Sequence, residues 1–155
     1  MKSVFVVLFL LVHYSGACQV AIGYFPFNSS FIQLSSDPER LIFGDARLQT
    51  NTFKYNTTIE LGPYINIKRS EAINLYIGPG ISLSPFYNDG TNTVNFYFLS
   101  LGARIKPLPF NRDLAVLFEL SPTFNSEPRN DMLRTNLGMS YNFRFKKRSG
   151  KKTNS

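Results

Sequence analysis

The chain has 155 residues and a formal net charge of +7 at pH 7, and its single cysteine excludes a disulfide within the chain. Lys2 and the five basic residues after Phe145 supply six of the positive charges, which leaves +1 for residues 19–145 and no basic stripe or motif of the kind that binds nucleic acid. No stretch of 18 consecutive apolar residues follows the N-terminal segment, so a transmembrane helix is excluded there.

Residues 1–18 have the pattern of a secretory signal peptide. A lysine, an apolar run and three small residues follow one another, and we expect cleavage immediately before or immediately after Cys18. A buried N-terminal strand or helix is the alternative, and Cys18 could instead carry the lipid of a bacterial lipoprotein, although Ser15 stands where such sites usually have leucine. Cleavage would also remove His13, the single histidine, so the mature chain would have no Ser-His or Cys-His nucleophile and no ordinary zinc site.

Three alternating segments open the mature chain. Residues 19–27 predict a strand over most of their length, and residues 31–34 predict a short second strand after a polar turn. Alternate positions of a strand form two sets, called the two parities here, which face opposite sides of the sheet. In residues 41–53, Asp45 and Arg47 lie on one parity and mostly apolar residues lie on the other, which predicts a third strand. Whether residues 19–34 form one strand or two stays open at this point.

The clearest pattern is a pair of long strands at residues 57–68 and 73–84. In both strands apolar residues occupy one parity, and polar residues or glycine occupy the other. Each strand is about a dozen residues long, whereas strands of globular proteins average about 5–6 residues. A tilted transmembrane strand needs about 9–11 residues. The hairpin therefore predicts strands that cross a bilayer.

Three further alternating strands follow, at residues 94–106, 114–124 and 133–145. Six strands of matched length are then clear, and closed bacterial barrels have even strand numbers. We therefore expect two strands from residues 19–34 and an all-β fold, a closed antiparallel up-and-down β-barrel of eight strands that is transmembrane. The barrel would occupy residues 19–145, and residues 146–155 would form a basic, disordered tail.

This pattern resembles the small outer-membrane β-barrels of Gram-negative bacteria, of the OmpA/OmpX type. The resemblance rests on the signal peptide, the alternating strands, the unequal loops and a last strand that ends in aromatic residues. It implies location in the bacterial outer membrane, with residues 85–93 and 125–132 outside and residues 69–72, 107–113 and 146–155 on the periplasmic side. Barrels of this kind commonly finish at the final aromatic residue, whereas ten residues follow Phe145 here.

In such a barrel the polar parity points into the lumen. Eight strands leave an interior about wide enough for side chains to fill, and an isolated buried charge is costly. We therefore expect the lumen charges to be paired in a network that stiffens the barrel. A narrow polar conduit is one alternative, and a catalytic carboxylate pair of Glu60 and Glu119 is another. The predicted network consists of Asp45, Arg47, Glu60, Tyr64, Tyr76, Arg104, Glu119 and Arg134.

Aromatic residues gather near the ends of the predicted strands. They predict two girdles that anchor the barrel at the lipid headgroups, and the alternative is ordinary packing at the mouth of a soluble barrel. The predicted interfacial aromatics are Tyr24, Phe53, Tyr55, Phe86, Tyr87, Phe124, Phe143 and Phe145.

The sequence thus favours a non-catalytic outer-membrane protein, either structural or an accessory subunit of a larger outer-membrane assembly or secretion complex. We expect no cofactor and no metal. The expected partners are outer-membrane lipids and other outer-membrane proteins, with the basic tail either contacting anionic headgroups or remaining solvated. The main alternative is a secreted soluble barrel of the lipocalin kind, with the apolar parity turned inward around a hydrophobic ligand. A pore for small solutes is a third hypothesis, although eight strands leave little open channel.

Overall fold

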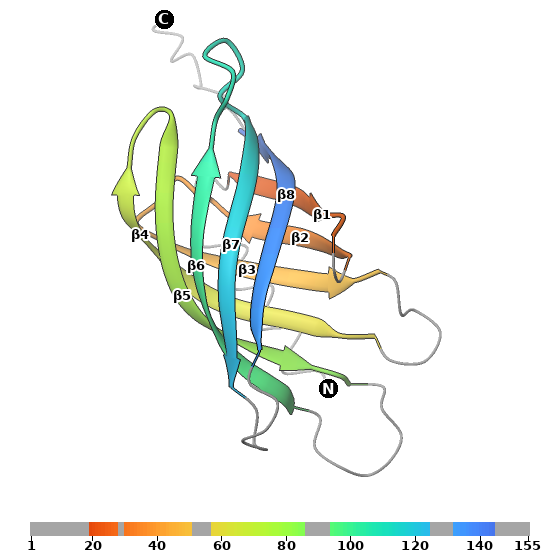
Figure 1. Ribbon diagram of the computed structural model, residues 1–155. Coiled ribbons are helices and arrows are strands. Elements are labelled where there is room, and N and C mark those ends of the chain that lie inside the picture. Colours follow the sequence, from red (N-terminus) through yellow and green to blue (C-terminus); the bar gives the residue numbers. More distant parts are fainter. Residues whose placement is uncertain (1–18, 28–29, 51–56, 86–93, 125–131, 145–155) are drawn as a thin grey trace, which may run out of the picture.

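The computed structural model describes residues 19–27, 30–50, 57–85, 94–124 and 132–144. The strands are β1 (Val20–Phe25), β2 (Phe31–Ser36), β3 (Ile42–Gln49), β4 (Ile59–Arg69), β5 (Ile73–Leu83), β6 (Val94–Ile105), β7 (Leu114–Phe124) and β8 (Leu133–Phe143). Each strand pairs with the next in antiparallel fashion, and β1 pairs with β8 to close the sheet (Figure 1). The predicted fold, a closed up-and-down barrel of eight strands, is therefore confirmed. This part of the chain contains no helix long and apolar enough to cross a membrane.

The two ends of the barrel differ in their connections. At one end, called the turn end here, residues 37–41, 70–72 and 106–113 join the strands. The opposite end, called the loop end, has the connections at residues 26–30, 50–58, 84–93 and 125–132. The turns are closed by local hydrogen bonds: the backbone N–H of Ser70 donates to the carbonyl of Ile73 at 3.0 Å, and Asp37 adopts a φ of 28° that Asp tolerates in turns.

Alternation along the strands separates an apolar outer face from a mainly polar interior. In β4, for example, Glu60 and Tyr64 are buried inside the barrel, whereas Leu61 and Ile65 are exposed on its outer face. The same division holds in the other strands because successive side chains of a strand point to opposite faces. The large exposed side chains of the wall are therefore mostly aliphatic or aromatic, which is the reverse of the arrangement in a soluble barrel.

The walls of the barrel are uneven in length. Strands β4–β8 have 11 or 12 residues, whereas β1 and β2 have six each and β3 has eight. The prediction of six strands of matched length is thus wrong for β3. This strand ends at Gln49, which lies directly opposite Phe31, the first residue of β2, and one further backbone hydrogen bond joins the N–H of Thr50 to the carbonyl of Ser30 at 2.8 Å. Likewise β1 stops at Phe25, before Pro26, which has no N–H to continue the ladder.

The backbones of β4 and β5 approach closely where Gly78 faces the lumen. A Cβ placed on Gly78 would lie 2.2 Å from the carbonyl oxygen of Pro63 and 2.8 Å from the Cα of Tyr64. Both of these are backbone atoms, so they cannot swing aside as the end of a side chain can. Only glycine fits this position without moving the strands apart.

Replacing Gly78 by alanine is therefore expected to destabilise the barrel by about 1–3 kcal/mol, the usual cost of overpacking. The chain has no tryptophan, so the folded fraction is best followed by gel mobility of unboiled samples across a urea series. Gly44→Ala is the matched control, since its added Cβ would be 3.5 Å from the nearest atom, the Oγ of Ser36. Equal urea midpoints for the two variants would contradict this prediction, because they would show that β4 and β5 can move apart to accommodate a Cβ without loss of stability.

Candidate functional site

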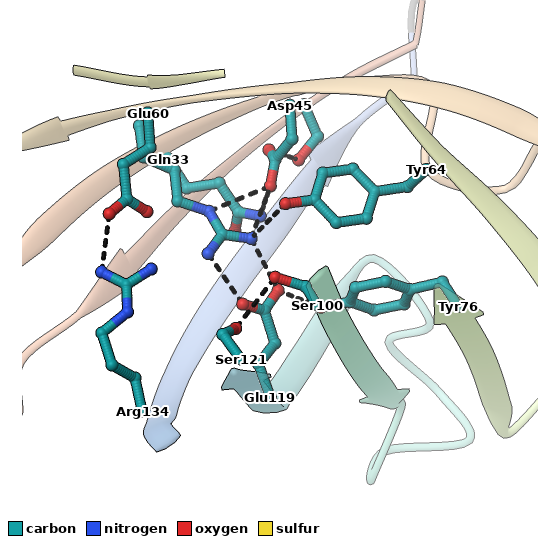
Figure 2. A network of polar contacts seen from close by, with 11 residues as sticks. Gln33, Asp45, Glu60, Tyr64, Tyr76, Ser100, Glu119, Ser121 and Arg134 are labelled. Atoms are coloured by element: carbon teal, nitrogen blue, oxygen red, sulfur yellow. Dashed lines mark hydrogen bonds and ion pairs between the residues drawn. The ribbon is translucent and has the colours of Figure 1, made fainter. Parts of the chain in front are cut away.

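The centre of the lumen is an arginine held between two carboxylates. Arg47 of β3 donates two hydrogen bonds of 2.7 Å to the carboxylate of Glu119 on β7, across the barrel. It also donates to Oδ2 of Asp45 at 3.1 Å from Nε and at 2.9 Å from Nη2. Figure 2 shows Asp45 and Glu119 approaching the same guanidinium group. All three side chains are buried, so this is a fully desolvated ion cluster that ties opposite walls together.

Neutral donors complete the cluster around the two carboxylates. Gln33 and Ser35 of β2 donate to Oδ2 and Oδ1 of Asp45, at 2.6 and 2.7 Å. The hydroxyl of Tyr76 donates to Oε1 of Glu119. Each carboxylate oxygen of Asp45 and Glu119 therefore has at least one donor, which is what a buried charge requires. Gln33 and Ser35 were absent from the predicted network. Gln33 lies in the predicted second strand, whereas Ser35 lies beyond the end predicted for that strand, which in the structure extends to Ser36.

A second ion pair lies nearer the loop end. Arg134 of β8 donates to Oε1 of Glu60 on β4 at 2.6 Å, and Glu60 is buried. The guanidinium carbon of Arg134 is 4.9 Å from the ring centre of Phe96 and 5.3 Å from that of Phe98. These aromatic faces add a cation–π attraction to the ion pair. Figure 2 shows this pair beside the central cluster and separate from it.

Aromatic rings fill the lumen on the turn-end side of the central cluster. Phe43 and Tyr64 stack with ring centres 5.4 Å apart, and Tyr76 meets both rings edge-on at 5.5 and 5.6 Å. The guanidinium of Arg47 lies 5.8 Å from the ring of Tyr64. The lumen at this level is therefore packed with side chains, as expected for eight strands.

Arg104 of β6 departs from the expected pairing of lumen charges. Its side chain is only 3% exposed, yet none of its three guanidinium nitrogens has a hydrogen-bond partner among the described residues. Its guanidinium carbon lies 5.6 Å from the ring centre of Phe43. The carboxylates of Asp45 and Glu119 are engaged by Arg47 and by neutral donors, so the expectation that every lumen charge is paired does not hold here.

The lumen carboxylates are arranged as structural ion pairs. Glu60 is bound by Arg134, and Glu119 is bound by Arg47 and Tyr76. Both glutamates are almost fully buried, whereas a general acid or base must come within hydrogen-bond reach of a substrate. Across the described ranges, no group of three or more His, Cys, Asp or Glu side chains is placed to hold a metal ion.

Of the predicted interfacial aromatics, three lie in the described strands. Tyr24 and Phe124 are exposed on the outer face near the loop end, and Phe143 is exposed at the turn end. Tyr97 and Tyr141 were not predicted, although they are exposed on the same face near strand ends and lie on the apolar parity. The remaining predicted positions lie outside the described residues: Phe53, Tyr55, Phe86, Tyr87 and Phe145.

Comparison with known proteins bears on the fold. No protein-family model matches the chain, and no curated protein matches it. The chain is similar to a solved structure described as "De novo design of transmembrane beta-barrels", with 19% sequence identity and a TM-score of 0.52. The match covers 82% of this chain and 93% of the designed one. At this identity the likeness concerns the fold alone, which is a closed antiparallel β-barrel.

Proposed function

We propose that the mature chain spans the outer membrane of a Gram-negative bacterium as a non-catalytic barrel. In this role it is a structural protein or an accessory subunit of a larger outer-membrane assembly or secretion complex. The observation that carries the proposal is the apolar outer wall around a mainly polar, charge-paired interior. Such a wall is stable in hydrocarbon, where a closed barrel leaves no backbone group unpaired. In water it would leave large apolar side chains exposed on every strand.

The alternatives receive less support from the described strands. A lipocalin-like barrel needs its apolar parity inside, whereas here that parity faces outward. A pore needs an open passage, whereas stacked rings and ion pairs occupy the middle of the lumen. Neither a hydrophobic ligand nor a solute channel is favoured by a specific feature.

The two terminal segments enter the proposal from the sequence. Residues 1–18 and 145–155 lie outside the described residues. We propose that the first is a cleaved signal peptide, and that the basic tail at residues 146–155 contacts anionic lipid headgroups on the periplasmic side. Outer-membrane lipids and other outer-membrane proteins are the partners that the apolar wall fits.

Fractionation of a Gram-negative host that expresses the full chain tests the location. We expect the protein to stay in carbonate-washed membranes and to migrate differently on a denaturing gel when it is not boiled. A protein in the soluble fraction with no heat-dependent shift would overturn the proposal. Native gels of membranes solubilised in mild detergent then separate the two roles, because an accessory subunit runs in a larger complex and a solitary structural protein does not.

A further inference from the structure

The turn end of the barrel contains a hollow of about 480 Å³ whose lining is rich in charge. Four cationic and two anionic side chains contribute to it, together with one serine. The lining residues are Glu39, Arg69, Ser70, Glu71, Lys106, Arg112 and Arg144. We call this hollow the turn-end vestibule.

Most of the vestibule cations have a carboxylate partner. Lys106 pairs with Glu39 at 2.8 Å, and Arg112 pairs with Glu71 at 2.9 Å. Arg144 pairs with an aspartate of the turn between β6 and β7 at 2.6 Å. Arg69, exposed at the end of β4, has no ion pair within the described ranges. The rim thus carries one cation that no carboxylate neutralises.

A second unneutralised cation lies in the same cross-strand row as Arg69, although it does not itself line the hollow. Arg104 is the inward-facing residue of β6 that precedes Lys106, and it is buried without a partner in the part of the chain that the structure describes. Asn74 lies opposite Arg104 on β5, and its amide donates to Oε2 of Glu39 at 3.3 Å. A buried guanidinium without an acceptor is costly, so this position favours the arrival of an anion.

We propose that the turn-end vestibule binds a phosphate group between Arg69 at the rim and Arg104 at the inner side. The planar guanidinium group is suited to phosphate because it presents two parallel donors to two oxygens. Glu39 is the competing acceptor, since its carboxylate bridges Lys106 and Asn74 at the mouth. Phosphate entry would displace Glu39 from these donors. The proposal does not rest on the location proposed above, because the site consists of residues of this chain alone.

Titration of the folded barrel in neutral detergent with inorganic phosphate tests the site. Ionic strength is held constant with chloride, and binding is measured by calorimetry. We expect a saturable signal whose affinity falls by about tenfold or more in Arg104→Gln, the loss that follows from one charge-assisted hydrogen bond. Arg69→Gln should weaken binding as well, and because Arg69 is exposed at the end of β4 we expect this variant to keep the fold. Glu39→Gln should strengthen binding by removing the competing charge.

Arg40→Gln is the matched control, because Arg40 lies at the same end but pairs with Asp37 and does not line the vestibule. Its affinity should equal that of the unaltered chain. The absence of a saturable signal, or equal affinities for Arg104→Gln, Arg69→Gln and the unaltered chain, would overturn the proposal. Competition by dihexanoyl phosphatidic acid identifies the source of the phosphate: tighter binding than inorganic phosphate assigns the site to a lipid headgroup, and weaker binding assigns it to free phosphate.

Discussion

Replacing Arg47 by methionine is expected to lower the free energy of unfolding by about 3–5 kcal/mol, the usual cost of removing one partner from a buried ion pair. The change leaves the carboxylates of Asp45 and Glu119 without their common cation in the centre of the lumen. Gln33, Ser35 and Tyr76 still donate to these oxygens, but they are neutral and cannot balance two buried charges. The urea midpoint of the gel-mobility shift in detergent micelles measures the loss.

A triple variant separates the charge effect from the loss of packing. Arg47→Met combined with Asp45→Asn and Glu119→Gln removes all three charges and should recover much of the stability that Arg47→Met alone loses. This non-additive recovery is the diagnostic result. If Arg47→Met unfolds at the same urea concentration as the unaltered chain, or if the triple variant is the less stable of the two, the lumen cluster does not stabilise the barrel.

Replacing Leu101 by arginine is expected to cost about 2–4 kcal/mol in lipid vesicles, the range for a cation on the outer face of a barrel at the bilayer midplane. Leu101 lies in the middle part of β6, faces outward and is 45% exposed. In a soluble protein the same surface change would alter stability by no more than about 0.5 kcal/mol. The variant therefore distinguishes a membrane-facing wall from a water-facing one. Folding yield and urea midpoint in phospholipid vesicles are the measurements.

Phe110→Arg provides the control for Leu101→Arg. Phe110 is 85% exposed and belongs to the connection between β6 and β7 at the turn end, away from the middle of the wall. A cation near the interface costs only about 0–1 kcal/mol. A small effect at both positions would contradict the placement of the wall in hydrocarbon.

The fold was predictable because period-2 alternation is a local signal. Along β4 and β5 each apolar residue is followed by a polar residue or glycine, and this alone indicates both the strand and the face that each side chain takes. Strand ends were harder to predict, since β3 ends at Gln49, opposite the first residue of β2, whereas its own alternation continues to Phe53. The end of a strand therefore depends on its pairing partner, which no local pattern of residues describes.

It was easier to predict which residues face the lumen than to predict which of them pair with one another. Inward parity places Arg47, Glu119 and Arg104 in the interior, but the partner of each depends on the register around the whole barrel. Arg47 and Glu119 are 72 residues apart in the chain and on opposite walls, so no sequence spacing relates them. Arg104 shows the same limit, because alternation predicts that it faces the lumen but not that its guanidinium group has no hydrogen-bond partner among the described residues.

In the proposed transmembrane placement, the uneven strands have a consequence for the surrounding lipid. At about 3.4 Å per residue and a tilt of about 40°, the six residues of β1 or β2 rise about 15 Å along the barrel axis, and the eleven residues of β4 rise about 28 Å. The apolar band of such barrels is about 25 Å tall, so the long walls match it and the short wall does not. A bilayer around this molecule must therefore thin beside β1 and β2, or the molecule must lean toward that side. Because the hydrophobic mismatch is confined to the side formed by β1 and β2, the barrel is not equivalent on all sides within the plane of the membrane. Another membrane protein that covered β1 and β2 would relieve the thinning, so this side is the preferred contact surface.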